Sequence, residues 1–241
     1  MSSYLNIIIP AHNEEGNLFN CMDALIKELK KTKVSFKIIV VNDCSIDRTQ
    51  EEINLLIRKY GSLIVPILRK RNNGFGNAVR AGLKNLDSKY FSLVMADASD
   101  DPKDLVRMVG LSKGNYDAIF TNRFIKGEVS NYPQLKLFVN RLGNNLISFL
   151  FFTRFNDLTN AFQLIKTDLI KNYKFNSEGF ELTAEISLLA LIKGSKFRQT
   201  HVKWFGRAVG VSKFKLFSLM SKYLFIIFKF LPYRLRLVKF K

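Results

Sequence analysis

Short apolar runs alternate with helix-patterned segments over the first half of the chain. Strand-like runs occupy residues 5–9, 36–41, 63–68, 90–96 and 117–121. Apolar residues three or four apart predict helices at residues 17–31, 49–59 and 76–86, and Asp101 followed by Pro102 starts another helix as a cap and a first-turn proline. This alternation predicts the α/β class, with a mostly parallel central sheet flanked by helices. Pro66 lacks a backbone N–H, which favours an edge position for the third strand.

The pattern changes after Pro133. Residues 135–155 form one long apolar segment that predicts a helix. Three shorter elements follow, which we expect as a strand near 162–165, a helix near 180–193 and a strand at 196–204. No internal repeat or low-complexity linker divides the chain. We therefore expect one domain over residues 1–213 and a tail over residues 214–241.

The tail is apolar, aromatic and basic. A helix over residues 216–231 would be about 24 Å long, which is short of the roughly 30 Å hydrocarbon core of a bilayer. Lys215, Lys222 and Lys229 recur every seven residues and would share one face of such a helix. This pattern predicts an amphipathic helix that lies in the plane of a membrane interface. Two alternatives stay open: a helix packed on the core with its lysines in water, and attachment through residues 135–155.

The charge balance points to an anionic partner. Among 241 residues, 38 Lys and Arg outweigh 20 Asp and Glu, and the formal net charge is +18. Nucleic acid, an acidic membrane surface or phosphorylated substrates would each suit this excess. The 22 phenylalanines and the lack of an RNA-binding motif argue against nucleic acid. The two cysteines, Cys21 and Cys44, have no metal-ligand spacing, and we expect both to stay reduced in a cytosolic compartment.

Polar residues follow three of the predicted strands. They occupy residues 10–15, 42–49 and 97–102, and each segment is rich in carboxylates. Because the carboxyl ends of parallel strands meet at one edge of a sheet, these side chains should converge there. Any one segment could simply cap the helix that follows it. Three such segments on three strands predict a ligand-binding edge.

An ordered series of short motifs strengthens this interpretation. The series comprises Ile-Ile-Pro-Ala-His-Asn-Glu-Glu at 8–15, Val-Asn-Asp-Cys-Ser at 41–45, Asn-Gly-Phe-Gly-Asn-Ala at 73–78, Asn-Arg-Phe at 122–124, Asp-Leu-Thr-Asn-Ala-Phe-Gln at 157–163, and Trp-Phe-Gly-Arg with Gly-Val-Ser-Lys at 204–213. In this order the chain resembles the family 2 glycosyltransferases of the GT-A fold. The resemblance covers most of the chain and points to the branch of dolichol-phosphate mannose synthases and polyprenyl-phosphate glycosyltransferases. Cys44 stands where that branch has glycine.

The resemblance implies roles for individual residues. The nucleoside of the donor would be held by Pro10, His12, Asn13, Glu14 and Asp43. Ala96 and Asp97 would face the diphosphate and its metal ion, and Arg123, Arg141, Arg207 and Lys213 would gather around the donor and acceptor phosphates. Asp97, Arg123, Arg207 and Lys213 would form the catalytic set. Fixed cations suit this chemistry because a diphosphate leaving group and a lipid phosphate bring several negative charges into one cleft.

The metal motif departs from the family pattern. The usual Asp-Ala-Asp is Met95-Ala96-Asp97 here. A thioether is a poor ligand for a hard cation, but Mg²⁺ often binds through one or two carboxylates together with substrate phosphates and water. We therefore expect a weak Mg²⁺ or Mn²⁺ site at Asp97, with Asp100 as a helper. The alternative is a site that works without metal, through Arg123 and Arg207.

The resemblance implies an inverting enzyme that moves a hexose from GDP-mannose or a UDP-sugar to a polyprenyl or dolichyl phosphate. A phosphate monoester has a second pKa of about 6, so this nucleophile needs positioning more than a general base. We expect this hexose transfer to occur at the cytoplasmic face of a membrane. A hydroxyl acceptor, with Glu181 or Glu185 as base, is one alternative. An inactive nucleotide-sugar-binding homologue is another, and a separate membrane partner or a homo-oligomer stays open.

Overall fold

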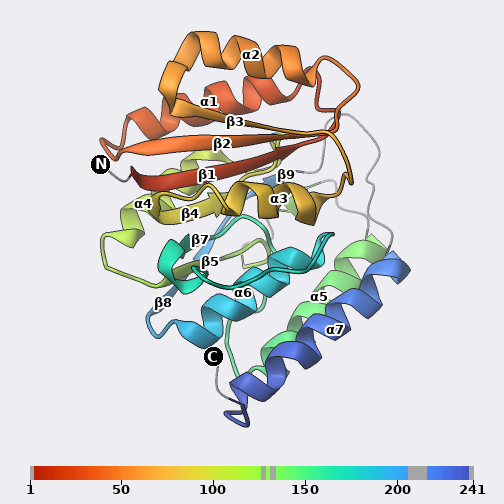
Figure 1. Ribbon diagram of the computed structural model, residues 1–241. Helices are drawn as coiled ribbons and strands as arrows, with labels where there is room; N and C mark the ends of the chain where they lie inside the picture. Colours follow the sequence, from red (N-terminus) through yellow and green to blue (C-terminus); the bar gives the residue numbers. More distant parts are fainter. Residues whose placement is uncertain (1–2, 126–128, 131–133, 206–215, 239–241) are drawn as a thin grey trace.

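A seven-stranded sheet forms the centre of the computed structural model, which describes residues 3–125, 129–130, 134–205 and 216–238 (Figure 1). The strand order is β3-β2-β1-β4-β7-β5-β8. The strands are β1 (Ser3–Ala11), β2 (Phe36–Asp43), β3 (Ile64–Arg69), β4 (Ser88–Leu93), β5 (Ala118–Asn122), β7 (Leu164–Lys166) and β8 (Phe197–His201). All neighbours run parallel except β7, which lies antiparallel between β4 and β5. The predicted α/β class and mostly parallel sheet are confirmed.

Both faces of the sheet are covered. Ile7 and Ile9 of β1 pack in one core with α1 (Leu18–Lys30), α2 (Thr49–Tyr60) and α4 (Pro102–Ser112). Ile8, between them, points into the other core. That second core includes α3 (Phe75–Leu83), α5 (Gln134–Leu150), α6 (Glu181–Lys193) and α7 (Leu216–Arg234). Burial on both faces explains why β1 is a continuous apolar run instead of an alternating one.

Several element boundaries differ from the sequence prediction. The fourth strand ends at Leu93: Val94 N still donates to the backbone oxygen of Ile8 at 3.1 Å, but Met95 N donates to Asp100 Oδ2 in the following loop. The long helix ends at Leu150, and Phe152 adopts a left-handed conformation with φ of 47°. The strand expected near 162–165 is shifted to β7, and the strand expected at 196–204 divides into β8 and a short β9 (Trp204–Phe205). β9 pairs with β6 (Val129–Ser130), which the sequence did not predict. The short helices η1 (Gly61–Leu63) and η2 (Thr167–Leu169) complete the fold.

The predicted edge position of Pro66 is confirmed, since β3 is the first strand of the sheet. The predicted C-terminal helix is present as α7, and it packs on α6 through Ile226, Ile227 and Phe230. The expected boundary between residues 213 and 214 lies outside the described residues. Among the described residues, no helix combines the length and the hydrophobicity that crossing a lipid bilayer requires.

Candidate functional site

The loops that follow β1 and β2 are joined by hydrogen bonds. His12 Nδ1 lies 2.6 Å from the backbone oxygen of Asp43, and it must carry the proton because a carbonyl only accepts. Asn13 N donates to Ser45 Oγ at 3.1 Å, and Ile46 N donates to Asn13 Oδ1 at 2.9 Å. The structure thus brings His12, Asn13 and Asp43 together, as expected from the sequence.

Glu14 and Pro10 lie at the same edge. Pro10 is next to last in β1 and pairs in register with Val41. Glu14 N donates to Thr49 Oγ1 at 2.9 Å, and Asn17 Nδ2 donates to Glu14 Oε2 at 3.4 Å. Side chains of the second loop therefore hold the backbone of the first loop in place.

Asp43 is enclosed by the end of β3. Its Oδ2 accepts a hydrogen bond from Gly74 N at 2.7 Å, and its Oδ1 is paired with the guanidinium of Arg69. Arg69 also donates to the backbone oxygen of Asn72 at 2.8 Å. Both side chains are largely buried. The carboxylate is thus fixed in one orientation by a cation and a backbone N–H.

The segment after β4 folds around a buried carboxylate. Met95 N donates to Asp100 Oδ2 at 3.0 Å, and Ser99 N donates to Asp97 Oδ1 at 3.2 Å. Ala98 between them is left-handed, with φ of 57°. Burial raises the pKa of Asp100 to about 7, and the nearby charge of Asp97 acts in the same direction while Arg123 opposes it. Asp100 therefore shapes this loop, whereas Asp97 is only partly buried.

The carboxylates of the first and third loops gather around Cys21 of α1. Burial raises the pKa of the Cys21 thiol to about 12, and the charges of Asp100, Asp97 and Glu14 act in the same direction. Cys21 Sγ also donates to the backbone oxygen of Met95 at 3.4 Å. A thiol with this pKa is protonated at neutral pH and is a poor nucleophile. Its position links the loops after β1 and β4 in one cluster.

The metal ligands available here are few. In the parts of the chain that the structure describes, no three His, Cys, Asp or Glu side chains are grouped so that they could hold a metal ion. Asp97 supplies a hard oxygen donor, and Ala96 and Met95 supply no oxygen side chain. This donor set fits a cation that takes most of its ligands from a bound diphosphate and water.

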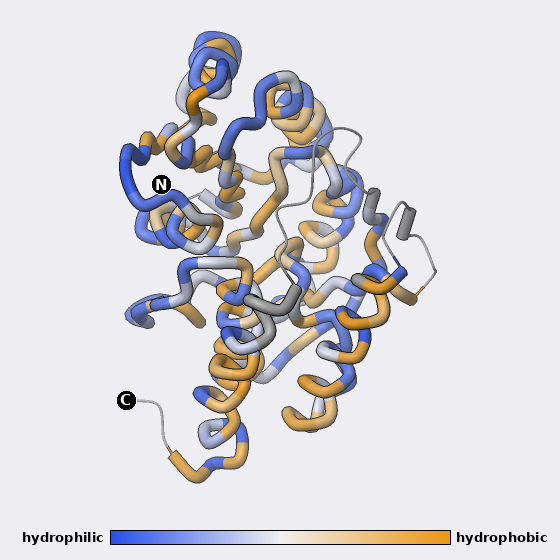
Figure 2. Tube along the Cα trace, turned by 90° about the vertical axis from the view of Figure 1, so that its right-hand side faces the viewer, coloured by the Kyte–Doolittle hydropathy of each residue, from blue (hydrophilic) through white to orange (hydrophobic). Residues whose placement is uncertain are grey.

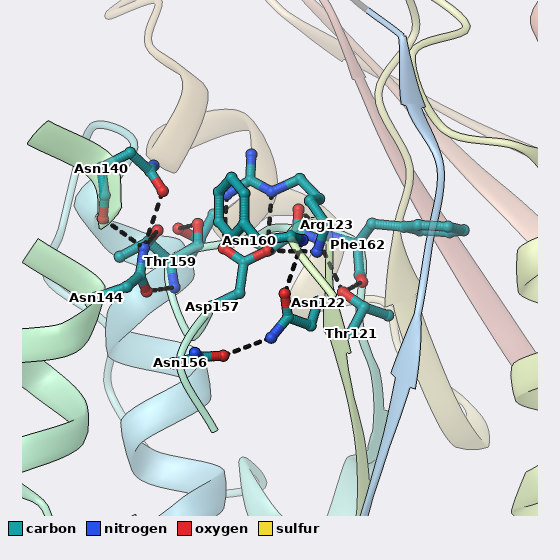
Figure 3. Close-up of polar contacts among 12 residues, drawn as sticks. Thr121, Asn122, Arg123, Asn140, Asn144, Asn156, Asp157, Thr159, Asn160 and Phe162 are labelled. Carbon is teal, nitrogen blue, oxygen red and sulfur yellow. Dashed lines mark hydrogen bonds and ion pairs between the residues drawn. The ribbon is translucent and has the colours of Figure 1, made fainter. Parts of the chain in front are cut away.

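Arg123 and Asp157 form a buried bidentate ion pair (Figure 3). Arg123 Nε donates to Asp157 Oδ2 at 2.9 Å, Nη2 donates to Oδ1 at 2.7 Å, and the backbone N donates to Oδ2 at 3.0 Å. The aspartate is 1% exposed and the arginine 9%. Asp157 therefore fixes the plane of the guanidinium at the carboxyl end of β5.

The rest of the 157–163 motif binds the surrounding elements together. Asn160 Nδ2 donates to Thr121 Oγ1 of β5 at 2.8 Å. Asn144 Nδ2 of α5 donates to Thr159 Oγ1 at 2.8 Å, and Thr159 N returns a hydrogen bond to Asn144 Oδ1 at 3.1 Å (Figure 3). The motif thus joins β5 to α5 and holds Arg123 between them.

Arg141 lies beside Arg123 through a shared aromatic ring. The guanidinium carbon of Arg141 is 4.8 Å from the ring centroid of Phe124, and that of Arg123 is 5.3 Å away. Such cation–π contacts stabilise each arginine by about 0.5–1 kcal/mol at exposed sites. Two of the four predicted cations are therefore neighbours, while Arg207 and Lys213 lie outside the described residues.

Glu185 of α6 is committed to structural contacts, and Glu181 is engaged through Oε1, whereas its buried Oε2 accepts no hydrogen bond among the described residues. Glu185 is fully buried, accepts from the Tyr173 hydroxyl at 2.8 Å, and pairs with Lys229 of α7 at 2.8 Å. Glu181 Oε1 accepts from the backbone N–H groups of Glu178 and Gly179 at 3.2 and 3.0 Å. Lys222 Nζ approaches Glu181 Oε1 to 4.0 Å. The lysine face of α7 therefore turns toward α6.

Two residues that the sequence analysis did not assign are central to this site. Arg69 follows the third strand, so the rule that placed the other polar clusters after strands would have found it. Asp157 begins a motif whose role was left unspecified. Both act by holding a charged partner: Arg69 holds Asp43, and Asp157 holds Arg123.

Comparison with known proteins gives a consistent set of relatives. The family model described as glycosyl transferase family 2 matches residues 6–174. A dolichol-phosphate mannosyltransferase of Pyrococcus furiosus is 28% identical over 217 residues, covering 88% of this chain and 59% of the relative. An undecaprenyl-phosphate 4-deoxy-4-formamido-L-arabinose transferase of Edwardsiella ictaluri is 27% identical over 120 residues, covering 50% and 37%. The chain thus spans only part of the length of these two relatives.

Solved structures share the fold at low sequence identity. Glucosyl-3-phosphoglycerate synthase of Mycobacterium tuberculosis, in complex with Mn²⁺, UDP and phosphoglyceric acid, superposes with a TM-score of 0.68 at 14% identity, covering 95% of this chain and 78% of that one. TarS of S. aureus in complex with UDP gives a TM-score of 0.65 at 15% identity, covering 99% and 67%. These likenesses support the predicted GT-A type of fold.

Proposed function

The chain belongs to glycosyl transferase family 2, and from this premise we propose that it transfers a hexose from a nucleotide sugar to a polyprenyl or dolichyl phosphate. The observation that carries the proposal is the arrangement of charge at the carboxyl edge of the sheet. Carboxylates cluster after β1, β2 and β4, and arginines lie at the end of β5 and on α5. The acceptor class is supported by the P. furiosus and E. ictaluri relatives, a dolichol-phosphate mannosyltransferase and an undecaprenyl-phosphate sugar transferase.

The donor nucleoside would bind at the loops after β1 and β2. Pro10, His12, Asn13, Glu14 and Asp43 would line this subsite. Asp43 is suited to accept a hydrogen bond from a base, because Arg69 and Gly74 fix its carboxylate before any ligand arrives. Such preorganisation lowers the entropic cost of binding. GDP-mannose and UDP-sugars are the donors to test first.

The diphosphate would lie near Ala96 and Asp97. Asp97 would hold Mg²⁺ or Mn²⁺ together with the donor phosphates. Such a cation neutralises the charge that develops on the leaving diphosphate. The side chain of Ala96 is buried in the core, so this residue would meet the diphosphate through its backbone.

The arginines would bind the phosphates. Arg123 and Arg141 present two positive charges beside the ring of Phe124, and Arg207 and Lys213 would add two more. Asp157 uses two of the N–H donors of Arg123 and fixes its plane, so Arg123 needs no rearrangement when an anion binds. Fixed cations of this kind stabilise a transition state more than mobile ones do.

The reaction would be a single in-line displacement with inversion. An oxygen of the lipid phosphate attacks the anomeric carbon, the bond from that carbon to the donor diphosphate breaks, and the nucleoside diphosphate leaves with the electron pair. The attacking oxygen is already ionised at neutral pH. The chain would therefore contribute positioning and charge, with no general base required.

The engagement of Glu181 and Glu185 weighs against a hydroxyl acceptor. Glu185 and Oε1 of Glu181 hold partners in α7 and residues 173–179, so among the described contacts of these two carboxylates only Oε2 of Glu181 accepts no hydrogen bond. We place the enzyme at the cytoplasmic face of a membrane, as a peripheral protein, because its acceptor would be a membrane lipid.

The proposal is tested by supplying purified protein with a short polyprenyl phosphate, Mg²⁺ and radiolabelled GDP-mannose, UDP-glucose or UDP-N-acetylglucosamine in separate reactions. We expect one donor to give a labelled lipid that mild acid cleaves, as a glycosyl phosphate is cleaved. Arg207→Ala and Lys213→Ala should each lower turnover at least about tenfold, the size expected for one lost charge-assisted contact.

Three results would contradict the proposal. Labelled transfer to a glycan or glycolipid hydroxyl would favour the alternative acceptor. Binding of a nucleotide sugar without transfer to any acceptor would favour an inactive homologue. Full turnover in excess EDTA would remove the metal from the proposal and leave the arginines to act alone.

A further inference from the structure

The outward side of α5 carries a stripe of exposed apolar residues. Its inward side buries Asn144 and Ile147. The exposed residues recur every three or four positions, which is the spacing of one helix face. They are Leu135, Phe138, Leu142, Leu146 and Phe149, and Phe152 follows just after the helix.

The outward side of α7 carries a second stripe. Ile226, Ile227 and Phe230 face the core, and Lys229 turns to Glu185. The opposite side exposes Leu224, Phe225 and Phe228, and the residues after the helix expose Leu235, Leu237 and Val238. Every phenylalanine that is exposed in the described residues belongs to one of these two stripes, and each is at least 65% exposed.

The two helices run side by side (Figure 1). Their C-terminal ends are tied together, because Arg234 Nε of α7 donates to the backbone oxygen of Phe151 at 2.7 Å and Nη2 donates to that of Phe152 at 3.3 Å. Figure 2 shows hydrophobic segments along both helices. We call the two stripes together the α5–α7 surface. The other exposed large apolar residues of the described chain, Ile46, Leu55, Leu68 and Ile125, are scattered over separate elements.

The chain around this surface is basic and contains no acid. Residues 134–156 hold three Lys and Arg, residues 214–241 hold seven, and neither segment has an Asp or Glu. These two segments therefore supply ten of the eighteen net positive charges of the chain. Arg154 and Arg236 are exposed beside the apolar stripes. The combination of exposed phenylalanine and leucine with flanking cations is complementary to an anionic lipid surface.

We propose that the α5–α7 surface docks the protein on an anionic bilayer, with the two helices lying together in the headgroup region. The inference rests on the proposed function in one respect, since a lipid acceptor makes a membrane the expected partner. It goes beyond the sequence prediction, which treated the tail and residues 135–155 as alternative attachment sites, because it joins α5 and α7 in one docking surface. Contiguous apolar patches on soluble proteins mark interaction sites, and the charge pattern selects lipid over a protein surface.

The docking also accounts for the inward turn of Lys229 on α7, whereas the side chain of Lys222 is 53% exposed. Lys229 neutralises the buried Glu185, so the outward face of the helix is left apolar at its centre. Basic residues then remain at the ends of the surface, where headgroup phosphates would meet them. A helix with lysines along its outward centre would instead sit higher in the interface.

The test is flotation of the full chain with vesicles of phosphatidylcholine and phosphatidylglycerol at about 2:1. Phe138→Ser with Phe149→Ser alters α5, and Phe225→Ser with Phe228→Ser alters α7. All four side chains are exposed, so the core is untouched. We expect each pair to lower vesicle affinity at least about tenfold, since each loses two immersed aromatic rings. Leu55→Ser with Leu68→Ser, two exposed leucines elsewhere, is the matched control and should change affinity less than about twofold.

The outcomes separate the possible partners. Wild-type vesicle binding by the α5 pair would overturn the two-helix surface, and equal losses in the control pair would overturn its location. Equal binding to pure phosphatidylcholine would overturn the charge contribution. A dimer in solution that the substitutions dissociate would make a second copy the occupant. The assay contains no sugar donor, so its result is independent of whether the proposed transfer occurs.

Discussion

The loops that follow β1, β2 and β4 differ from the α5–α7 surface in whether their exposed groups have partners within the protein. In the loops, backbone N–H groups are bonded to side chains of the neighbouring loop, as with Asn13 and Ser45. On the two helices, large apolar side chains such as Phe149 and Phe228 have no protein cover among the described residues. One region has completed its contacts within the chain and the other has not.

The difference suggests a division of labour. A prearranged polar edge suits a small charged ligand, because the ligand meets groups that are already oriented. An uncovered apolar surface suits a large partner that has an apolar surface or interior of its own, such as a lipid bilayer. Chemistry and attachment would then respond to different substitutions, and the following four predictions test whether they do.

The largest expected effect is on the stability of the site scaffold. Asp157→Ala removes the carboxylate that is paired with the buried guanidinium of Arg123, and breaking such a buried pair costs about 3–5 kcal/mol in the free energy of unfolding. Urea denaturation measures this. Lys37→Ala is the control, because it breaks the exposed pair with Asp87 and should cost less than about 1 kcal/mol. Equal costs for the two variants would mean that the ion pair does not organise the site.

The next effect is a dependence of stability on pH. Burial raises the pKa of Asp100 in the folded chain from its ordinary value of 3.8 to about 7. Between these values the folded chain keeps a proton that the unfolded chain has lost, so this group lowers stability as pH rises from about 4 to about 7. The loss is at most about 4 kcal/mol, at 1.36 kcal/mol for each pKa unit.

Asp100→Asn should abolish this part of the pH dependence and make the protein more stable than wild type at pH 8. The neutral amide can still accept a hydrogen bond from Met95 N through its oxygen. Thermal unfolding of both proteins between about pH 5 and pH 8 gives the comparison, because most of the interval between the unfolded and folded pKa values of Asp100 lies in this pH range. A variant that keeps the wild-type slope would show that Asp100 does not titrate in this interval.

The third effect is on activity alone. Asp97→Asn removes the negatively charged carboxylate that is proposed to bind the metal ion near the diphosphate. Turnover should fall about a hundredfold, which corresponds to a loss of about 3 kcal/mol of transition-state stabilisation. Vesicle binding should be unchanged, because Asp97 is not part of the α5–α7 surface. Parallel loss of vesicle binding would end the proposed division of labour.

The smallest effect is a gain in stability in the polar edge. Cys44 has φ of 58°, a left-handed conformation that costs most residues about 1 kcal/mol and glycine almost nothing. Cys44→Gly should therefore raise the free energy of unfolding by up to about 1 kcal/mol, as measured with urea. Cys21→Ala is a useful contrast, since it removes a buried thiol and should destabilise. A destabilised Cys44→Gly variant would show that the thiol makes a contact worth more than the strain.

The sequence predicted the sheet because buried parallel strands have an unmistakable pattern. β1 and β2 are apolar at nearly every position and end at polar residues, so their type and their ligand-facing ends could both be inferred. β6, β7 and β9 were missed or misplaced because each has only two or three residues. Strands that short are defined by their hydrogen-bond partners, which the local pattern does not contain.

The location of the site residues could be predicted from the sequence, but the residues with which they interact could not. His12, Asn13 and Asp43 could be placed at one edge from the strand ends. Which residues form ion pairs could not be predicted, because Arg69 is 26 residues from Asp43 and Asp157 is 34 residues from Arg123. Pairing over such separations depends on how the chain packs. The inward orientation of Lys229 was unpredictable for the same reason, since Lys229 pairs with a buried glutamate on another helix.

The antiparallel strand β7 has a consequence for how the protein is made. β1 to β4 can pair as soon as residue 93 has left the ribosome, but β5 has no neighbour in the sheet until β7 or β8 is synthesised. At about 5–20 residues per second, the 44 residues from Asn122 to Lys166 take about 2–9 s. During that time Ile119 and Phe120, which are buried in the finished sheet, stay exposed on the nascent chain. We expect this strand to be the segment that a ribosome-associated chaperone binds.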